Sequence, residues 1–251
     1  MIAEAKDKLT SEPIPPQRID STPRYRGPAS VVRYLAVLSH AFTVAVKEWG
    51  WIEHNPVLKV TKPTEPRGRV RFLSEQERNA LLTACRESSN PWLYTCVVVA
   101  LSTGMRKGEL MGLTWQDVDL QAGRIVLQET KNNERCVVPL TGPALALLKD
   151  HAKVRRIDTD LLFPGHRGTA PIDLRTPWET ALKRAGIEDF RWHDLRHSTA
   201  SYLAMNGASI AEIAEVLGHK TLNMVKRYAH LSEAHTARVV ESMNARIFGE
   251  G

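Results

Sequence analysis

Residues that begin and end helices recur along most of this chain, and they constrain its fold more than any other feature. Three stretches match the capping box, in which a serine or threonine and a glutamate three residues later bond the first free N–H groups of a helix: Ser74-Glu-Gln-Glu, Thr176-Pro-Trp-Glu and Ser209-Ile-Ala-Glu. Glycines stand where predicted helices end, at Gly186, Gly207 and Gly218. The pattern predicts a mainly α-helical domain.

One part of the chain breaks this helical pattern. Residues 123–130 and 135–140 are β-prone runs, and Lys131-Asn-Asn-Glu between them is polar. We therefore expect an antiparallel hairpin with an exposed polar tip, following a more apolar helix over 91–102 that Gly104 interrupts. The predicted fold class is α+β, mainly α with a small antiparallel sheet.

The first part of the chain is expected to be separate. One helical stripe runs through Val31, Leu35, Leu38, Phe42, Val46 and Trp49, with Gly50 at its end. After it, Lys59-Val-Thr-Lys-Pro-Thr-Glu-Pro-Arg-Gly has prolines and no apolar rhythm, which is typical of a linker. We predict a boundary near residue 67, with a small helical domain and linker over 1–66 and a larger domain over 67–251.

Charge favours a polyanionic partner. The chain has 34 Lys and Arg against 28 Asp and Glu, a formal net charge of +6, which suits nucleic acid, although many basic proteins bind none. The three cysteines show neither close pairing nor metal-ligand spacing, so a reduced, cytosolic protein is expected. The longest apolar stretch seen in the sequence, residues 96–101, is too short to cross a bilayer.

The densest chemical signal is Arg191-Trp-His-Asp-Leu-Arg-His. On a helix, His193 and Arg196 project about one turn apart on one face, and an imidazole beside a guanidinium suits a phosphate. A plain basic helix face is an equally good interpretation of this heptapeptide alone. A zinc site on His193 and His197 is disfavoured, because the position after the first histidine holds Asp194 rather than the required glutamate, and an arginine repels a cation.

Four boxes in order carry a resemblance: Gly104-Met-Arg-Lys-Gly-Glu-Leu, His193-Asp-Leu-Arg-His, Leu217-Gly-His219 and Arg227-Tyr228-Ala-His. At these separations they resemble the successive signatures of the tyrosine recombinase (phage integrase) catalytic domain, over roughly residues 70 to 235. The resemblance implies a mainly helical catalytic domain with a small antiparallel sheet. It also implies that residues 1–66 are a partial core-binding, DNA-binding domain, since about one helix pair fits there.

The resemblance assigns the catalytic residues position by position: Arg106, Lys131, His193, Arg196, His219 and Tyr228 as nucleophile. The two arginines would stabilise the extra negative charge of a five-coordinate phosphorus. His193 would accept the phenol proton, His219 would donate a hydrogen bond to the phosphate, and Lys131 would protonate the departing 5′-oxygen. Glu109 and Asp194 are read as structural residues that orient arginines or cap backbone.

The implied activity is site-specific cleavage and rejoining of double-stranded DNA through a 3′-phosphotyrosyl link, without metal, cofactor or ATP. The enzyme would work as a homotetramer on paired sites, in the cytoplasm of a bacterium and at the nucleoid, encoded by the bacterium or a phage. Two alternatives stay open: a catalytically silent or truncated DNA-binding module, and a type IB topoisomerase. The C-terminal helix, with an apolar stripe over 239–248, either folds onto its own domain or docks on a neighbouring protomer.

Overall fold

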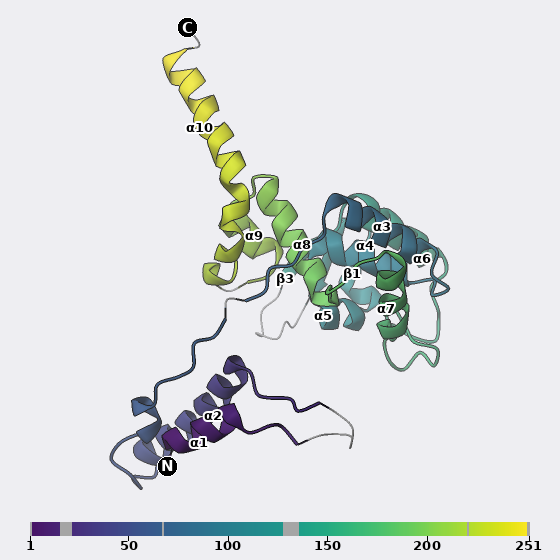
Figure 1. Cartoon of the computed structure of the whole chain (residues 1–251). Helices are drawn as coiled ribbons and strands as arrows, with labels where there is room; N and C mark the ends of the chain where they lie inside the picture. The colour runs from purple at the N-terminus through teal and green to yellow at the C-terminus, as the bar shows by residue number, and fades with distance from the viewer. Residues whose placement is uncertain (1, 16–21, 67, 128–135, 220, 250–251) are drawn as a thin grey trace. The chain divides into compact units, whose positions relative to one another are not determined.

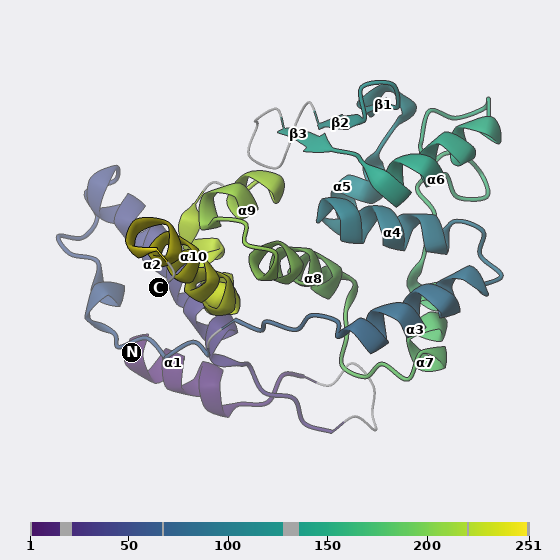
Figure 2. The ribbon, with the colours of Figure 1, turned by 90° about the horizontal axis from the view of Figure 1, so that it is seen from above.

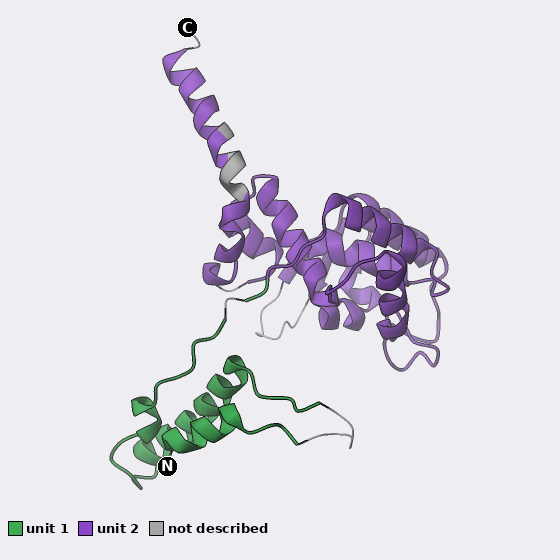
Figure 3. Cartoon of the chain, viewed as in Figure 1, with its two compact units in different colours: residues 1–69 green, residues 70–251 purple. Residues whose placement is uncertain are grey.

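The chain forms two compact units, residues 1–69 and 70–251, in a computed structural model that describes residues 2–15, 22–66, 68–127, 136–219 and 221–249. Figure 3 colours the two units separately, and each is described by itself. The identity of the first unit as a partial core-binding domain stays a prediction.

The first unit is built on two helices, α1 (Ile2–Ser11) and α2 (Pro28–Lys47), and a 3₁₀ turn, η1 (Pro56–Lys59). Val31, Leu35 and Val57 form its small buried core. Asn55 caps η1 by accepting the Val57 N–H at 3.0 Å and donates to the Ser39 carbonyl at 2.8 Å, which ties the turn to α2. The predicted apolar stripe is thus buried only in part, because Leu38 and Trp49 remain exposed.

Helix α2 is the one helix of the described ranges whose length and composition would let it cross a membrane, with a mean hydropathy of 1.5 over its 18-residue window. Residues 96–101 are still the longest uninterrupted apolar run, but α2 is longer and meets the criterion on average although it contains Arg33, Ser39 and His40. Core helices of soluble proteins meet the same criterion, so hydropathy alone does not decide what surrounds α2.

The second unit is mainly helical, which confirms the predicted fold class. Its α-helices (Figure 1) are α3 (Glu75–Arg86), α4 (Leu93–Thr103), α5 (Lys107–Gly112), α6 (Gly142–Lys153), α7 (Arg175–Arg184), α8 (Trp192–Met205), α9 (Ile210–Val216) and α10 (Glu233–Phe248). Three 3₁₀ segments join them: η2 (Trp115–Asp117), η3 (Leu222–Met224) and η4 (Lys226–Ser232).

A three-stranded antiparallel sheet with order β1-β2-β3 forms the β part of this unit: β1 (Val118–Asp119), β2 (Arg124–Leu127) and β3 (Cys136–Pro139). Strands β2 and β3 pair from Arg124 with Pro139 to Leu127 with Cys136, which agrees with the predicted hairpin. The predicted polar tip lies outside the described residues. Strand β1 was not expected, because two residues are too few to show a period.

Helix α8 lies at the centre of the second unit. It packs against α4 on one side and against α9 on the other, as Figure 2 shows, and it also contacts η4. The main core gathers the buried faces of α3, α4, α7 and the sheet, whereas Ala200, Ala204, Ile213, Leu217 and Tyr228 belong to a second cluster between α8, α9 and η4. Residues of α8 therefore border both cores.

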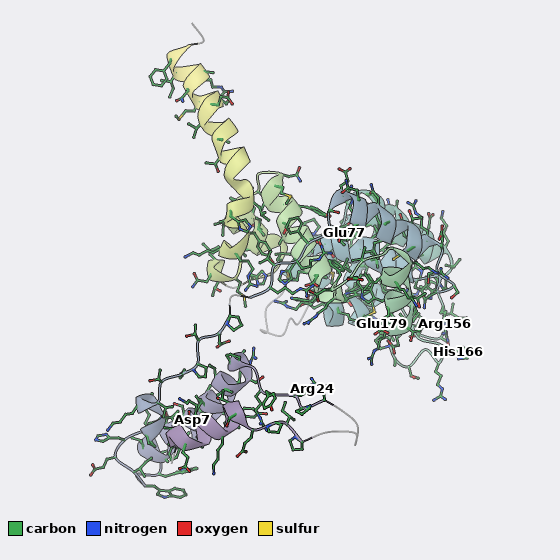
Figure 4. The ribbon with its side chains drawn as sticks, in the orientation of Figure 1. Asp7, Arg24, Glu77, Arg156, His166 and Glu179 are labelled. Atoms are coloured by element: carbon green, nitrogen blue, oxygen red, sulfur yellow. The ribbon has the colours of Figure 1, made fainter. Side chains whose placement is uncertain are left out.

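Two of the three predicted capping boxes are confirmed. Ser74 accepts the N–H of Glu77, which is labelled on α3 in Figure 4, and Ser209 accepts the N–H of Glu212. The prediction at Thr176 is wrong, because α7 already begins at Arg175.

An earlier residue takes over the role expected of Thr176. Asp173 accepts the Arg175 N–H at 2.9 Å, and so bonds the start of α7. Glu179, also labelled in Figure 4, forms an ion pair with the Arg175 side chain one turn before it instead of reaching back to the backbone.

Candidate active site

The start of α8 is held by hydrogen bonds within its own first turns and by one to the segment before α3. Asp194 accepts the backbone N–H of Arg191 at 2.8 Å, which confirms its structural role. Ser198 accepts the Leu73 N–H at 3.0 Å and donates to the Asp194 carbonyl at 2.9 Å. The helix turns that carry His193 and Arg196 are therefore held rigidly.

Arg196 is a buried charged group on these turns, at 5% exposure. Its guanidinium donates to the Gly104 carbonyl at 2.8 Å, to the Leu217 carbonyl, and to Nε2 of His219 at 3.0 Å. These bonds join the end of α4, α8 and the end of α9. An arginine has five N–H donors, so the guanidinium is oriented by backbone and still has donors for a ligand.

His219 follows Gly218, which ends α9 with a positive φ of 60°. Arginine can only donate, so Nε2 of His219 must accept from Arg196 and the ring proton sits on Nδ1, 3.1 Å from the Met224 sulfur. The sequence expectation gave His219 a donor role toward phosphate. In this arrangement it braces Arg196 instead.

Arg106 stands at the beginning of α5, and Glu109 binds it twice. One oxygen of Glu109 accepts the Arg106 backbone N–H at 2.9 Å, and the other accepts from its guanidinium at 2.6 Å. Glu109 thus caps the helix and orients the arginine, as the sequence suggested. Arg106 keeps 36% of its side chain exposed, so water screens its charge more than that of Arg196.

Tyr228 lies in η4 and is only 3% exposed, packed among the second cluster. Its hydroxyl forms a short hydrogen bond with Nδ1 of His197. The sequence instead predicts His193 as the partner of this phenol, and it suggests for His197 only a disfavoured metal site. The contact spans 31 residues of sequence, and the only available signal was the shared helix face of His193 and His197.

The electrostatic interactions among the site residues show that these side chains lie close together. Burial and the charge of Arg106 lower the pKa of Arg196 to about 10. Burial and the charge of Arg196 lower the pKa of His219 to about 4 and also lower that of His193. Burial raises the pKa of Tyr228, against the opposing field of Arg227 and Arg196. At neutral pH the histidines and the phenol are therefore uncharged, and the arginines carry the positive field.

The structure thus brings together five of the six residues expected at the site: Arg106, His193, Arg196, His219 and Tyr228. Lys131 lies outside the described residues. Strand β3, which follows the predicted hairpin tip, reaches the same place, because Cys136 feels the charges of Glu109, Arg196 and Arg106. A Cβ on Gly218 would lie 3.5 Å from the Cys136 sulfur.

The donor set suits an oxyanion better than a cation. Over the ranges that the structure describes, no group of three or more His, Cys, Asp or Glu side chains is placed to hold a metal ion. Two guanidinium groups, one of them buried, instead offer planar N–H donors that match phosphate oxygens. The arrangement can hold a phosphodiester near a tyrosine hydroxyl.

A mainly helical fold with a small antiparallel sheet, presenting two arginines, histidines and a tyrosine at one place, defines the class of tyrosine recombinase catalytic domains. Residues 71–235 match the phage integrase family, and the chain belongs to that family.

Similar proteins agree with this assignment. The integrase of Salmonella phage P22 is 33% identical over 90% of this chain and 60% of its own length, and the shufflon-specific DNA recombinase of Escherichia coli is 37% identical over 84% of this chain and 53% of its own. The catalytic domain of bacteriophage HP1 integrase matches 73% of this chain and 100% of its own, with 30% identity and a TM-score of 0.55. The chain therefore spans little more than half the length of the P22 integrase and of the shufflon-specific recombinase.

Proposed function

We propose that this chain is a site-specific DNA recombinase or integrase, which cuts and rejoins DNA strands through a covalent 3′-phosphotyrosyl link to Tyr228. Membership of the phage integrase family and the similarity to a protein named as a DNA recombinase support this. The bond energy would be kept in the phosphotyrosyl link, so a second DNA end can reverse the step.

The observation that carries the proposal is the buried, backbone-fixed guanidinium of Arg196 close to Arg106. A phosphate attacked by an oxygen nucleophile gains negative charge on its non-bridging oxygens. Preorganised donors at that place therefore stabilise the transition state more than the ground state. The two arginines would bind those oxygens.

A bound phosphate changes what the two site histidines do. A phosphate oxygen facing Arg196 would compete with Nε2 of His219 as acceptor, and its negative charge would raise the pKa of that ring. His219 could then donate to the phosphate in the role the family resemblance implies. His193, exposed on α8, would face the same anion.

The proton that the departing 5′-oxygen needs is assigned to Lys131, by the family resemblance alone. A mobile ammonium is a competent general acid. We further propose that neither metal nor ATP takes part, because the arginines supply the charge that a metal ion supplies in many phosphoryl-transfer sites.

The partner is proposed to be double-stranded DNA bound by a homotetramer. The apolar stripe of α10 supports an oligomer, because its large side chains stand about half exposed or more: Val239, Val240, Met243, Ile247 and Phe248. Figure 1 shows α10 extending away from the rest of its unit. Of the two expectations for this helix, we therefore favour docking on a neighbouring protomer. We place the enzyme in the cytoplasm, at the nucleoid, and assign unit 1 the role of a partial core-binding domain.

A nicked suicide duplex tests the proposal. Cleavage should release a short fragment and trap a protein–DNA adduct that survives denaturant, and Tyr228→Phe should form none while binding DNA as tightly as wild type. A library of duplexes in the same assay reports the target site. Wild-type protein that binds but forms no adduct would favour a catalytically silent binding module, and relaxation of supercoils by isolated monomers would favour a type IB topoisomerase.

A further inference from the structure

His197 is the residue near the nucleophile that the proposed mechanism does not use. It lies one turn beyond His193 on α8, half-buried, and its ring centroid is 6.0 Å from that of Tyr228. Its Nδ1 is the atom bonded to the phenol oxygen. A general base must be within hydrogen-bond reach of the proton it removes, and this nitrogen is.

The protonation states give that bond a direction. Burial and the charge of His193 lower the pKa of His197 to about 4, and burial raises that of Tyr228, so both groups are neutral at pH 7. A phenol is a stronger donor than acceptor, because its oxygen lone pair is conjugated with the ring. The hydroxyl therefore donates to Nδ1, and the imidazole carries its own proton on Nε2.

We propose that His197 is the general base that takes the phenol proton of Tyr228 as its oxygen attacks phosphorus. This rests on the proposed strand cleavage. The O–H bond breaks and its proton goes to Nδ1, while an oxygen lone pair forms the bond to phosphorus. The P–O5′ bond breaks, and the 5′-oxygen takes a proton from the general acid. On rejoining, His197 returns its proton to the tyrosine.

Within the described residues, the charged and titratable groups that act on His197 determine its strength as a base. From α8 these are His193, Asp194 and Arg196, and from η4 they are Arg227 and Tyr228. Asp194 favours the protonated ring, whereas the cationic groups disfavour it. A bound phosphate offsets those cations, so the ring becomes a stronger base when substrate is present and as charge builds on the phosphorane.

His193 is the competing base, and its position weakens its case. Its ring lies 5.2 Å from the ring of His197, edge to face, on the exposed side of α8. The hydroxyl of Tyr228 bonds to His197 and not to His193. His193 is left free to face the phosphate.

Single-turnover cleavage of the nicked suicide duplex at saturating protein tests the base. His197→Asn keeps an acceptor near Nδ1 but cannot take a proton, and His197→Phe keeps only the ring shape. Both should bind DNA as wild type does and cleave about 10²- to 10⁴-fold more slowly. The matched control is His166→Asn in an exposed loop (Figure 4), which should cleave at the wild-type rate.

Two further readouts separate proton transfer from mere packing. The wild-type rate should level off above an acidic limb, whereas His197→Asn should keep rising tenfold per pH unit, because it needs the phenolate. A fluorinated, more acidic tyrosine at position 228 should speed His197→Asn more than wild type.

The outcomes are distinct. A wild-type cleavage rate in His197→Asn, faster cleavage in either variant, or loss of the acidic limb only in a His193 variant would overturn this inference and leave the proposed function standing. Absence of any adduct from wild type would overturn both. If His197→Phe fails to fold, shown by its melting curve, His197→Asn still decides.

Discussion

Gly104 supports the candidate site from the end of α4, and an added methyl group there should be costly. Its φ is +65°, and its carbonyl accepts from Arg196. A Cβ built on it would lie 2.4 Å from a methyl carbon of Leu217 and 3.3 Å from one of Thr199. Leu217 is 3% exposed, so any shift of its side chain has to be accommodated inside the packed second cluster.

The expected loss follows from two terms. A left-handed backbone conformation costs an L-residue with a Cβ about 1–2 kcal/mol, and overpacking a buried site costs about 1–3 kcal/mol. Gly104→Ala should therefore lower the free energy of unfolding of the second unit by about 2–5 kcal/mol. For a domain of this size that corresponds to a melting temperature about 4–20 °C lower.

Urea denaturation followed by circular dichroism measures the loss, with two controls. Gly108→Ala meets no atom within 4 Å and has no positive φ, so in helix α5 it should stabilise by up to about 1 kcal/mol. In a double-mutant cycle, Leu217→Ala should relieve the clash and give a favourable coupling of about 1–3 kcal/mol with Gly104→Ala. A loss below about 0.5 kcal/mol, or strict additivity, would refute the reasoning.

Three other outcomes are expected. His197 and His219 have pKa values of about 4 in the folded chain against ordinary values of 6.5, so the unfolded chain binds more protons between these values. Urea melts should therefore show stability that is full above about pH 6.5 and falls on the order of 1–3 kcal/mol per histidine toward pH 4, and His219→Asn should flatten this slope. Glu109→Ala removes a helix cap and the acceptor for Arg106, so it should cost about 0.5–2 kcal/mol in urea melts and slow adduct formation; an unchanged adduct rate would show that Arg106 needs no such support. Affinity of Tyr228→Phe for DNA should fall linearly with salt on logarithmic axes, and adding Arg106→Ala should reduce the slope by about one; an unchanged slope would place that arginine away from phosphate.

The sequence could predict what depends on neighbours along the chain. The capping boxes at Ser74 and Ser209 bond residues three apart, so their residue types alone carry the information. The capping box predicted at Thr176 does not form, because Asp173 bonds the first turn of α7 instead. Both residues lie close enough to the helix start, and the sequence does not say which of them caps it. The hairpin was predictable from two β-prone runs, whereas the two-residue β1 was not.

Contacts between distant segments were beyond this reasoning. The four boxes identify residues that assemble at one place, but not which atom bonds which. Arg196 meets the Gly104 carbonyl 92 residues earlier, and Tyr228 meets His197 31 residues earlier. Both bonds depend on how α8 packs between α4 and η4. They can therefore be identified only once the fold is known.

The burial of Arg196 prepares the site to bind an anion. Its pKa of about 10 against an ordinary 12.5 means that holding the charge in the folded chain costs about 3 kcal/mol. Two backbone carbonyls offset part of the lost hydration, but carbonyl dipoles are weaker partners than an anion. A phosphate removes that penalty, and a phosphorane with more charge removes more of it. Because water already screens the partly exposed Arg106, the buried arginine has the larger capacity to discriminate the transition state from the ground state.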